Sequence, residues 1–443
     1  MLKRILDSSL FRSAGIYTIT QVINSAIPFL LMPILTRYLT PADYGIVAMF
    51  GVLLSFVAPF TGLSINGAIA RQYYERDETD MPRYISNCLL ILLSSTIIVG
   101  IIFYFLAEPI SKVASFPMQW MWAVIIVSAA QFINQINLTL WQVQVRPVSY
   151  GIYQISQTVL NLGFSLWFVV RLGMNWQGRI QAQVIAFVSF AIFGLFLLYR
   201  NGCIKFKVDR EYIKSALNFG VPLIPHSLGM VMMTMTDRIF ITNMVGVNAT
   251  GIYTVGYQIA MPISLLYTAF NQAYVPWLFE KLTYSGQSIK NKIVKLTYLY
   301  FVIILILSLG LAFIAPWLLS FFVGKDFASA SSFVLWLAIG NAFTGMYLMV
   351  TNYIFYAKKT AILAWITFFT AITSIVLNYI LISRNGAIGA AQAMTLTCFI
   401  RFMSTWVFSS RAYAMPWKYF KNDEELNLGC LVLGEFFIQI VPD

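Results

Sequence analysis

The sequence predicts an all-α polytopic membrane protein with about twelve transmembrane helices, and two observations support this. Of the 443 residues, 59% are hydrophobic and only 10% are charged, with a mean hydropathy of +0.75. Soluble proteins are about half apolar and a quarter charged, so this chain must use the bilayer as part of its solvent. Runs of about 20 apolar residues, long enough to cross a hydrocarbon core, also recur along the chain. These runs do not alternate with polar residues, so they indicate helices and not barrel strands.

The apolar runs define the expected helices in order. The first run follows Lys3 and Arg4 without a small-residue cleavage site, so we interpret it as a retained helix and not as a signal peptide. The expected spans are approximately 14–36, 44–66, 84–106, 119–140, 150–170, 181–200, 217–241, 251–273, 296–319, 331–354, 361–382 and 387–409.

Lysine and arginine residues predict how the helices are oriented. If the N-terminus is cytoplasmic, 21 of the 29 basic residues fall in cytoplasmic segments and 7 fall in outer loops or adjoining helix ends. The remaining one, Arg401, lies within the last span. This bias follows the positive-inside rule. We therefore expect a multi-pass inner-membrane protein with both termini in the cytoplasm.

The most charged connector in mid-chain, Arg200 to Lys214, divides the spans into two sets of six. At an offset of 206 residues, the segment ending in Gly45-Ile46 aligns with the segment ending in Gly251-Ile252. This similarity and the hydropathy predict two parallel six-helix repeats, since an even number of helices gives both halves the same topology. The expected domains are an N-terminal lobe (1–205), a C-terminal lobe (206–420) and a tail (421–443). The apolar part of the tail is too short for a span and is expected to lie on the membrane surface.

No motif for catalysis is present. The chain lacks a G-x-x-x-x-G-K-[ST] loop, which excludes a P-loop ATP-driven pump. A single histidine, His226, argues against a multi-histidine metal centre and against a nucleophile–histidine–acid set. The net charge of +12 is dispersed over the cytoplasmic loops, so nucleic-acid binding is not expected. We expect a transporter that is not an enzyme and uses no cofactor or metal.

Ionisable residues within membrane helices are energetically costly and are therefore candidate functional residues. Asp237 and Arg238, near the outer end of the seventh span, form either a local ion pair or a gate that lines a cavity. Arg401, at mid-depth of the twelfth span, must face the bundle interior or a partner, with a functional or a structural role.

Three further polar residues are candidates for contact with the substrate. Arg71, at the inner end of the second span, is either an anchor beside Glu75 or a contact for an anionic headgroup. Arg37, at the outer end of the first span, allows the same two interpretations. His226 is either a satisfied interior histidine or a proton-linked or substrate contact.

Prolines in the first helix of each half are candidate hinges. Pro28 and Pro33 lie in the first span, and Pro222 and Pro225 lie in the seventh. Proline removes a backbone donor and is expected to interrupt the helical hydrogen-bond ladder. Interrupted helices at matching positions of two repeats indicate a transporter's binding site and the place where it bends.

Several motifs in both halves resemble those of one known family. They are Ser13-Ala-Gly15, Pro33 to Gly45, Ala70 to Glu75, Thr236-Asp237-Arg238, Val245-Gly246, Gly251-Ile252-Tyr253 and Pro276 to Glu280. Over about residues 10–410, the chain resembles the polysaccharide-biosynthesis flippases. These are the O-antigen and capsular-repeat translocases of the multidrug/oligosaccharidyl-lipid/polysaccharide exporter superfamily.

The resemblance implies a MATE-like transporter with two lobes in a V around a central cavity lined by the first, second, seventh and eighth helices. It implies flipping of undecaprenyl-pyrophosphate-linked oligosaccharide repeat units to the periplasmic leaflet of the bacterial inner membrane, by alternating access, for O-antigen or capsule. The implied partners are this lipid-linked substrate, membrane lipids, and the polysaccharide polymerase and chain-length machinery.

Two alternatives follow from different chemistry. A cation-coupled multidrug antiporter of the same fold needs a carboxylate deep within a lobe, and spans one to six contain none at mid-depth. A membrane-integral glycosyltransferase or polymerase needs a large outer loop with acidic residues, whereas the predicted outer loops are short. Both observations favour the flippase.

Overall fold

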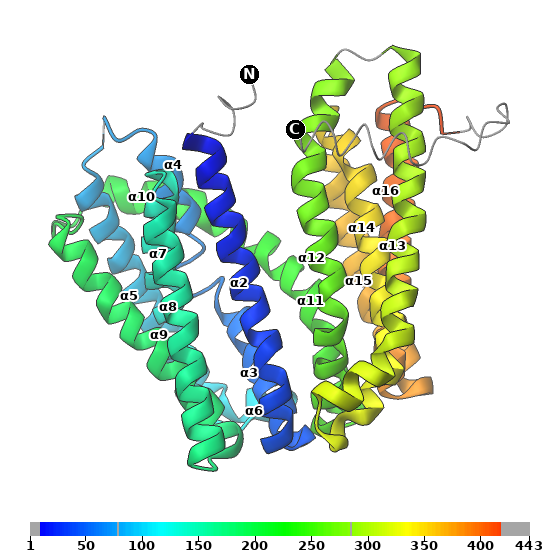
Figure 1. Ribbon diagram of the computed structural model, residues 1–443. Helices are drawn as coiled ribbons and strands as arrows, with labels where there is room; N and C mark the ends of the chain where they lie inside the picture. The colour runs from blue at the N-terminus through cyan, green and yellow to red at the C-terminus, as the bar shows by residue number, and fades with distance from the viewer. Residues whose placement is uncertain (1–8, 78, 284–285, 418–443) are drawn as a thin grey trace, which may run out of the picture. The chain divides into compact units, whose positions relative to one another are not determined.

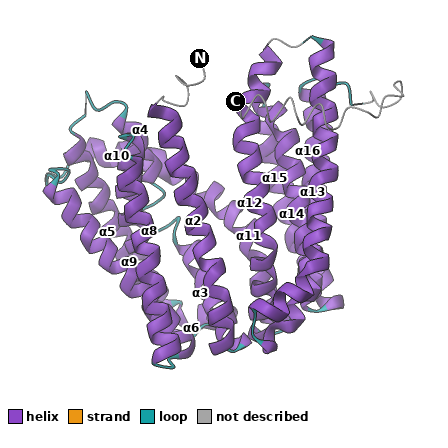
Figure 2. Cartoon of the chain, viewed as in Figure 1, coloured by secondary structure: helices purple, strands orange, loops and turns teal. Residues whose placement is uncertain are grey.

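A computed structural model describes residues 9–77, 79–283 and 286–417 of the protein. Every regular element in these ranges is helical, as Figure 2 shows, so the predicted all-α class is confirmed. The described chain divides into two compact units. Unit 1 takes in residues up to Thr254 together with Phe322–Phe327, and unit 2 takes in Val255–Phe321 and the residues from Ala328 onward. The lobe boundary predicted between residues 205 and 206 stays a prediction, and the predicted tail (421–443) lies outside the described residues.

Unit 1 contains the helices of the first half and the first helix of the second half. α2 packs beside α8, α7 and α8 pack on α9, and α11 packs on α3 (Figure 1). The helices are α2 (Ser9–Tyr38), α3 (Pro41–Val57), α4 (Asn66–Tyr73), α5 (Met81–Phe105), α6 (Ala107–Ala114), η1 (Met118–Trp120), α7 (Met121–Val143), α8 (Pro147–Leu166), the π-helical η2 (Trp167–Arg171), α9 (Asn175–Arg200), α10 (Arg210–Gly220), η3 (Val221–Leu223), α11 (Ile224–Met244) and the start of α12 (Val247–Thr283).

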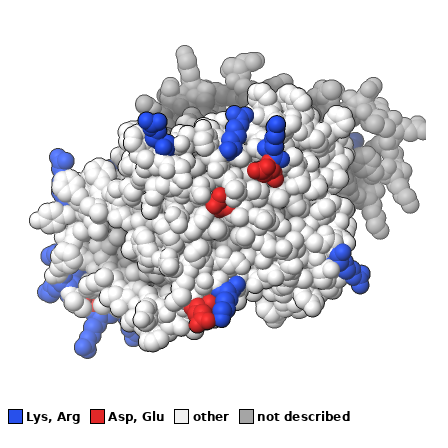
Figure 3. Space-filling view, turned by 90° about the horizontal axis from the view of Figure 1, so that it is seen from below, with Lys and Arg blue, Asp and Glu red and all other residues white. Residues whose placement is uncertain are grey.

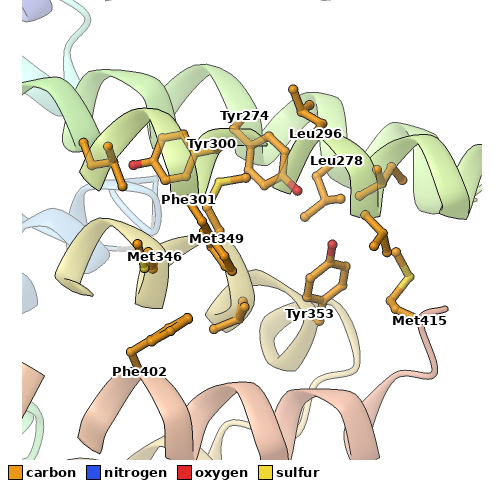
Figure 4. Close-up of a cluster of buried hydrophobic side chains, with 14 of the residues drawn as sticks. Tyr274, Leu278, Leu296, Tyr300, Phe301, Met346, Met349, Tyr353, Phe402 and Met415 are labelled. Atoms are coloured by element: carbon orange, nitrogen blue, oxygen red, sulfur yellow. The ribbon is translucent and has the colours of Figure 1, made fainter. Parts of the chain in front are cut away.

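Unit 2 is a bundle in which α16 packs against both α14 and α15. Its elements are the rest of α12, α13 (Gln287–Phe322) up to Phe321, the second half of η4 (Lys325–Ala330), α14 (Ser331–Tyr356), α15 (Ala361–Asn385) and α16 (Ala387–Ala412). Figure 4 shows its core, where Tyr274 of α12, Phe301 of α13, Met349 of α14 and Phe402 of α16 converge. Van der Waals packing of these large side chains helps to hold the four helices together in a bilayer, where burial from lipid gives no hydrophobic driving force.

Helical structure covers the positions of the twelve predicted spans, apart from a turn within the second. By length and apolar composition, seven stretches of the described residues qualify as membrane spans. They are Met81–Phe105, Met118–Val143, Asn175–Arg200, Arg210–Met244, Gln287–Phe322, Lys325–Tyr356 and Ala361–Asn385. The total of twelve and the orientation from basic residues stay predictions.

The second predicted span, 44–66, is not one continuous helix, so this prediction was wrong in its inner part. α3 ends at Val57, and α4 begins only at Asn66. Pro59 cannot donate to the helical ladder, and Gly62, Leu63 and Ser64 all have positive φ. The residues between the helices therefore form turns.

The candidate hinge prolines behave differently in the two halves. α2 runs through Pro28 and Pro33 as one helix. In the second half, a single 3-10 turn at Val221–Leu223, which contains Pro222, separates α10 from α11. Pro225 lies in the first turn of α11, where its missing N–H costs least. A break therefore occurs at Pro222, while the role of all four prolines as hinges stays a prediction.

Two glycines bring the first turns of α3 and α12 close together in unit 1. A methyl group on Gly45 would lie 2.0 Å from the carbonyl oxygen of Val247, and one on Gly251 would lie 1.9 Å from that of Pro41. The 206-residue offset aligns Gly45 with Gly251 and Pro41 with Val247, so the contact is reciprocal. Reciprocal contacts of this kind are typical of two-fold-related copies. The contact supports the predicted duplication, which stays a prediction.

Candidate charge sites within the two units

Asp237 and Arg238 form a buried ion pair on α11. Their side chains are 3.2 Å apart, and the residues are only 8% and 6% exposed. The Arg238 guanidinium also donates to the carbonyl oxygen of Thr234 at 3.0 Å, and the hydroxyl of Tyr253 donates to the Asp237 carboxylate. The opposite charges compensate each other and their polar atoms are hydrogen-bonded, as burial in an apolar helix requires. The structure therefore contains the local ion pair that was one of the two predicted interpretations.

Arg401 lies in α16 of unit 2 and has no carboxylate partner among the described residues. Its Nη2 donates to the hydroxyl of Thr344 at 3.2 Å, and its guanidinium carbon lies 4.5 Å from the ring centroid of Tyr347. Its Nε is buried and has no hydrogen-bond partner among the described residues. None of the ion pairs found in the described residues includes Arg401. A hydroxyl and an aromatic face stabilise the cation without cancelling its charge.

Arg179, near the start of α9 in unit 1, is a third arginine with polar partners on a neighbouring helix. Its Nη1 donates to Asn161 Oδ1 at 2.7 Å and to Ser165 Oγ at 2.6 Å, both on α8. It takes part in none of the ion pairs of the described chain. Sequence reasoning counted Arg179 only among the basic residues of the outer loops and adjoining helix ends and missed this site. The signal available was the four-residue spacing of Asn161 and Ser165, which places two polar side chains on one helical face.

The other predicted site residues, Arg71, Arg37 and His226, are exposed. Arg71 lies 3.7 Å from Glu75, which agrees with the anchor interpretation. Arg37 lies in the last turn of α2, and His226 lies in α11. The part of the chain that the structure describes contains no group of three or more metal-ligating side chains. In the face that Figure 3 shows, charged side chains are scattered over a mostly uncharged surface.

The connector after α9 is tied to the start of α5 by two ion pairs. Lys205 Nζ lies 2.9 Å from Asp80 Oδ2, and Arg83 Nη2 lies 2.9 Å from Asp209 Oδ2. The hydrogen bond from Lys205 lowers the pKa of the Asp80 carboxyl below its ordinary value. These pairs fix the segment before α10 to unit 1.

An apolar groove lies along α8, on the side opposite Asn161 and Ser165. The helical repeat of about 3.6 residues per turn places the two sets of side chains on opposite faces. The groove has a volume of about 640 Å³ and is lined by Ile155, Ser156, Val159, Leu160, Gly163, Phe164, Trp167 and Phe190. α8 therefore has one polar face and one hydrophobic face.

Comparison with known proteins identifies the family. The model of a family described as polysaccharide biosynthesis protein matches residues 10–282, which is more than half of the chain. The chain belongs to this family. An uncharacterized membrane protein of Haemophilus influenzae is 28% identical over 360 residues, covering 80% of this chain and 85% of that protein. The capsular polysaccharide biosynthesis protein CapF of Staphylococcus aureus is 24% identical over 426 residues, covering 89% and 98%.

Two solved structures show the fold of this family member. An inward-facing MATE multidrug transporter of the MOP superfamily matches with a TM-score of 0.69 at 17% identity, covering 90% of this chain and 96% of that chain. The lipid II flippase MurJ, in an inward closed conformation, matches with a TM-score of 0.69 at 14% identity, covering 98% and 93%. The predicted polysaccharide-biosynthesis family and the predicted MATE-like fold are therefore confirmed.

Proposed function

We propose that this protein flips undecaprenyl-pyrophosphate-linked oligosaccharide repeat units from the cytoplasmic to the periplasmic leaflet of the bacterial inner membrane. The product would serve O-antigen or capsular polysaccharide synthesis, and a polymerase and chain-length machinery would use it next. The family, the capsular relative and the MATE-like fold support this proposal. In it the protein is a transporter and not an enzyme, works by alternating access, and has both termini in the cytoplasm.

The observation that supports an anionic cargo best is the environment of Arg401. Keeping a charge within a membrane helix is costly, so such residues persist where they serve a function. The partners of Arg401 among the described residues include a hydroxyl and an aromatic ring but no carboxylate, and its Nε has no hydrogen-bond partner there. A pyrophosphate oxygen accepts strong charge-assisted hydrogen bonds from a guanidinium, whose planar fork matches phosphate geometry.

The lipid tail of such a cargo needs no polar path. A polyprenyl chain can remain in the hydrocarbon while the sugar and pyrophosphate cross. The apolar groove on α8 is open to an alkyl chain of this kind. The protein then has to shield only the polar head. This requires alternation between inward-facing and outward-facing conformations and no covalent step.

The alternative, a cation-coupled antiporter, lacks a suitable carboxylate in the described helices. Such a mechanism needs an acid that exchanges a proton or sodium ion for a cationic drug. Asp237 is buried, but Arg238 pairs with it and Tyr253 donates to it. An acid held in this way is a poor exchange site.

A strain without substitute flippases tests the proposal. Deleting the gene should abolish surface polysaccharide and leave lipid-linked repeat units facing the cytoplasm, as measured by their accessibility in oriented membrane vesicles. Complementation with the wild-type gene should restore the periplasmic pool. Repeat units that reach the periplasm at the wild-type rate in the deleted strain would overturn the proposal.

A further inference from the structure

One face of α8 carries a continuous row of uncharged polar side chains. They follow one another at spacings of three, one, three and four residues, which is the pattern of a single helical face. We call this row the amide stripe; it consists of Gln154, Gln157, Thr158, Asn161 and Ser165. Apolar side chains would face the bundle here if the helix were needed only for packing.

Two neighbouring helices add polar groups to the amide stripe. The hydroxyl of Thr158 donates to Asn24 Oδ1 of α2 at 2.8 Å. Arg179 of α9 donates to Asn161 and Ser165, as described above. Gln183 follows Arg179 by one helical turn, which places it on the same face of α9. Three helices of unit 1 therefore share one polar region.

Four amide atoms of this region are buried and have no hydrogen-bond partner in the described part of the chain. Gln157, which is only 8% exposed, has no hydrogen-bond partner for its Nε2. The same holds for Asn24 Nδ2, Gln154 Oε1 and Gln183 Oε1. Buried polar groups are nearly always satisfied, and each unpartnered one destabilises the fold, so such a concentration needs a functional explanation. Two of these atoms are donors and two are acceptors.

We propose that the amide stripe, with Asn24 and Gln183, binds the hydroxyl groups of a glycan and that Arg179 binds an anionic group at its end. A hydroxyl both donates and accepts, so it suits a site whose free atoms include both kinds. Both hydrogen bonds of Arg179 come from Nη1, which leaves its Nη2 edge for an anion. A metal cation would be repelled by Arg179 and finds no carboxylate in the amide stripe.

This inference rests on the proposed function, because the glycan would be the head of the translocated lipid. If the amide stripe had a purely structural role, apolar substitutions in it would reduce stability together with glycan binding. Replacing an unpartnered buried amide with leucine removes a destabilising group and is expected to leave stability unchanged or higher. Loss of glycan binding without loss of stability would therefore separate the two roles.

The test uses the full-length protein purified in detergent and the water-soluble repeat-unit oligosaccharide released from the host's own polysaccharide. Isothermal titration calorimetry measures binding, and thermal unfolding measures stability. We expect Gln157→Leu, Gln154→Leu and Gln183→Leu each to weaken binding by about tenfold or more while the melting temperature is kept or raised. The matched control is Asn378→Leu in unit 2, where a residue only 2% exposed also has an unpartnered Oδ1. This variant should bind like the wild type.

The outcomes separate this inference from the proposed function. Leucine variants that bind the oligosaccharide as the wild type does would overturn the inference. So would variants that all lose binding together with stability, because the amide stripe would then be structural. Transport of lipid-linked repeat units in proteoliposomes gives the second readout. No transport by the wild type contradicts the proposed function, whereas equal transport by the wild type and Gln157→Leu contradicts only the glycan site.

Discussion

Arg238 and Arg401 are both arginines within apolar helices, yet their surroundings differ in one decisive respect. Arg238 in unit 1 has a carboxylate beside it, and that carboxylate is itself hydrogen-bonded by Tyr253. Arg401 in unit 2 has a threonine hydroxyl and a tyrosine ring. The first site is electrically neutral, and the second keeps a full positive charge.

The difference separates two uses of an arginine in a membrane. A compensated pair fixes the packing of its helix and gives little attraction to a ligand, because its field is cancelled at short range. An uncompensated guanidinium attracts an anion and has donors left to bind it. We therefore assign Arg238 to the architecture of unit 1 and keep Arg401 and Arg179 as candidates for contact with cargo.

Breaking the pair at Arg238 should have the largest effect on stability. Asp237→Ala would leave Arg238 buried without its counter-charge, and we expect a loss of about 3–5 kcal/mol in the free energy of unfolding. Denaturant unfolding of the purified protein measures this loss. Replacing both members with apolar residues, as in Asp237→Leu with Arg238→Met, should recover most of it. If the single variant is as stable as the wild type, the pair does not compensate the charge as described.

Removing the charge at Arg401 should affect transport and leave stability largely unchanged. We expect Arg401→Ala to slow translocation in proteoliposomes by about tenfold to a hundredfold, the loss typical of one hydrogen bond to a charged group. Arg401→Lys should retain part of the activity because the charge is kept. Arg411→Ala is the matched control, since Arg411 is exposed in the last turn of the same helix. Equal transport by wild type and Arg401→Ala would remove Arg401 from the cargo path.

The close packing beside the Arg238 site should be sensitive to one methyl group. In Gly251→Ala, the new Cβ would lie 1.9 Å from the carbonyl oxygen of Pro41, so the backbone must shift. Overpacking of this kind costs about 1–3 kcal/mol, measurable by thermal unfolding. Gly229→Ala in α11 is the control, because nothing lies within 4 Å of its added Cβ. Similar melting temperatures for the two variants would show that α3 and α12 can separate freely.

The exposed pair of Lys205 and Asp80 should give the smallest effect. Lys205→Met should cost a few tenths of a kcal/mol, because exposed ion pairs contribute about 0.2–1 kcal/mol. The pKa of Asp80 is lowered in the folded protein, so its contribution is present above the unfolded pKa. It is lost as the pH falls through the folded pKa. The stability difference between wild type and variant should therefore shrink on acidification, and a difference that grows instead would contradict this.

The helical fold could be predicted from the sequence because each span must satisfy its own backbone hydrogen bonds. The run 44–66 was predicted as one helix because apolar composition does not reveal a turn. The break depends on Pro59 and on the positive φ at Gly62, Leu63 and Ser64. Pro222 and Pro225 of the seventh span did predict an interruption of the α-helix, because these two prolines lie within one helical turn of each other.

The candidate site was only partly predictable. Asp237 and Arg238 are adjacent, so their pairing could be considered from the sequence alone. Arg179 was counted among the outer basic residues, since its partners are on another helix and only packing brings them together. The unpartnered atoms of Gln157 and Gln183 could not be foreseen either, because hydrogen-bond satisfaction depends on every neighbouring helix.

The reciprocal contact of Gly45 and Gly251 has a consequence for the ancestry of the chain. Each glycine lies against the carbonyl oxygen of the residue four positions before the other glycine. A half-length polypeptide carrying only the first of these segments would thus present a surface complementary to itself. Two copies could associate through it before any gene fusion joined them. Fusion would then preserve the dimer contact within one chain and leave each half free to acquire different arginines.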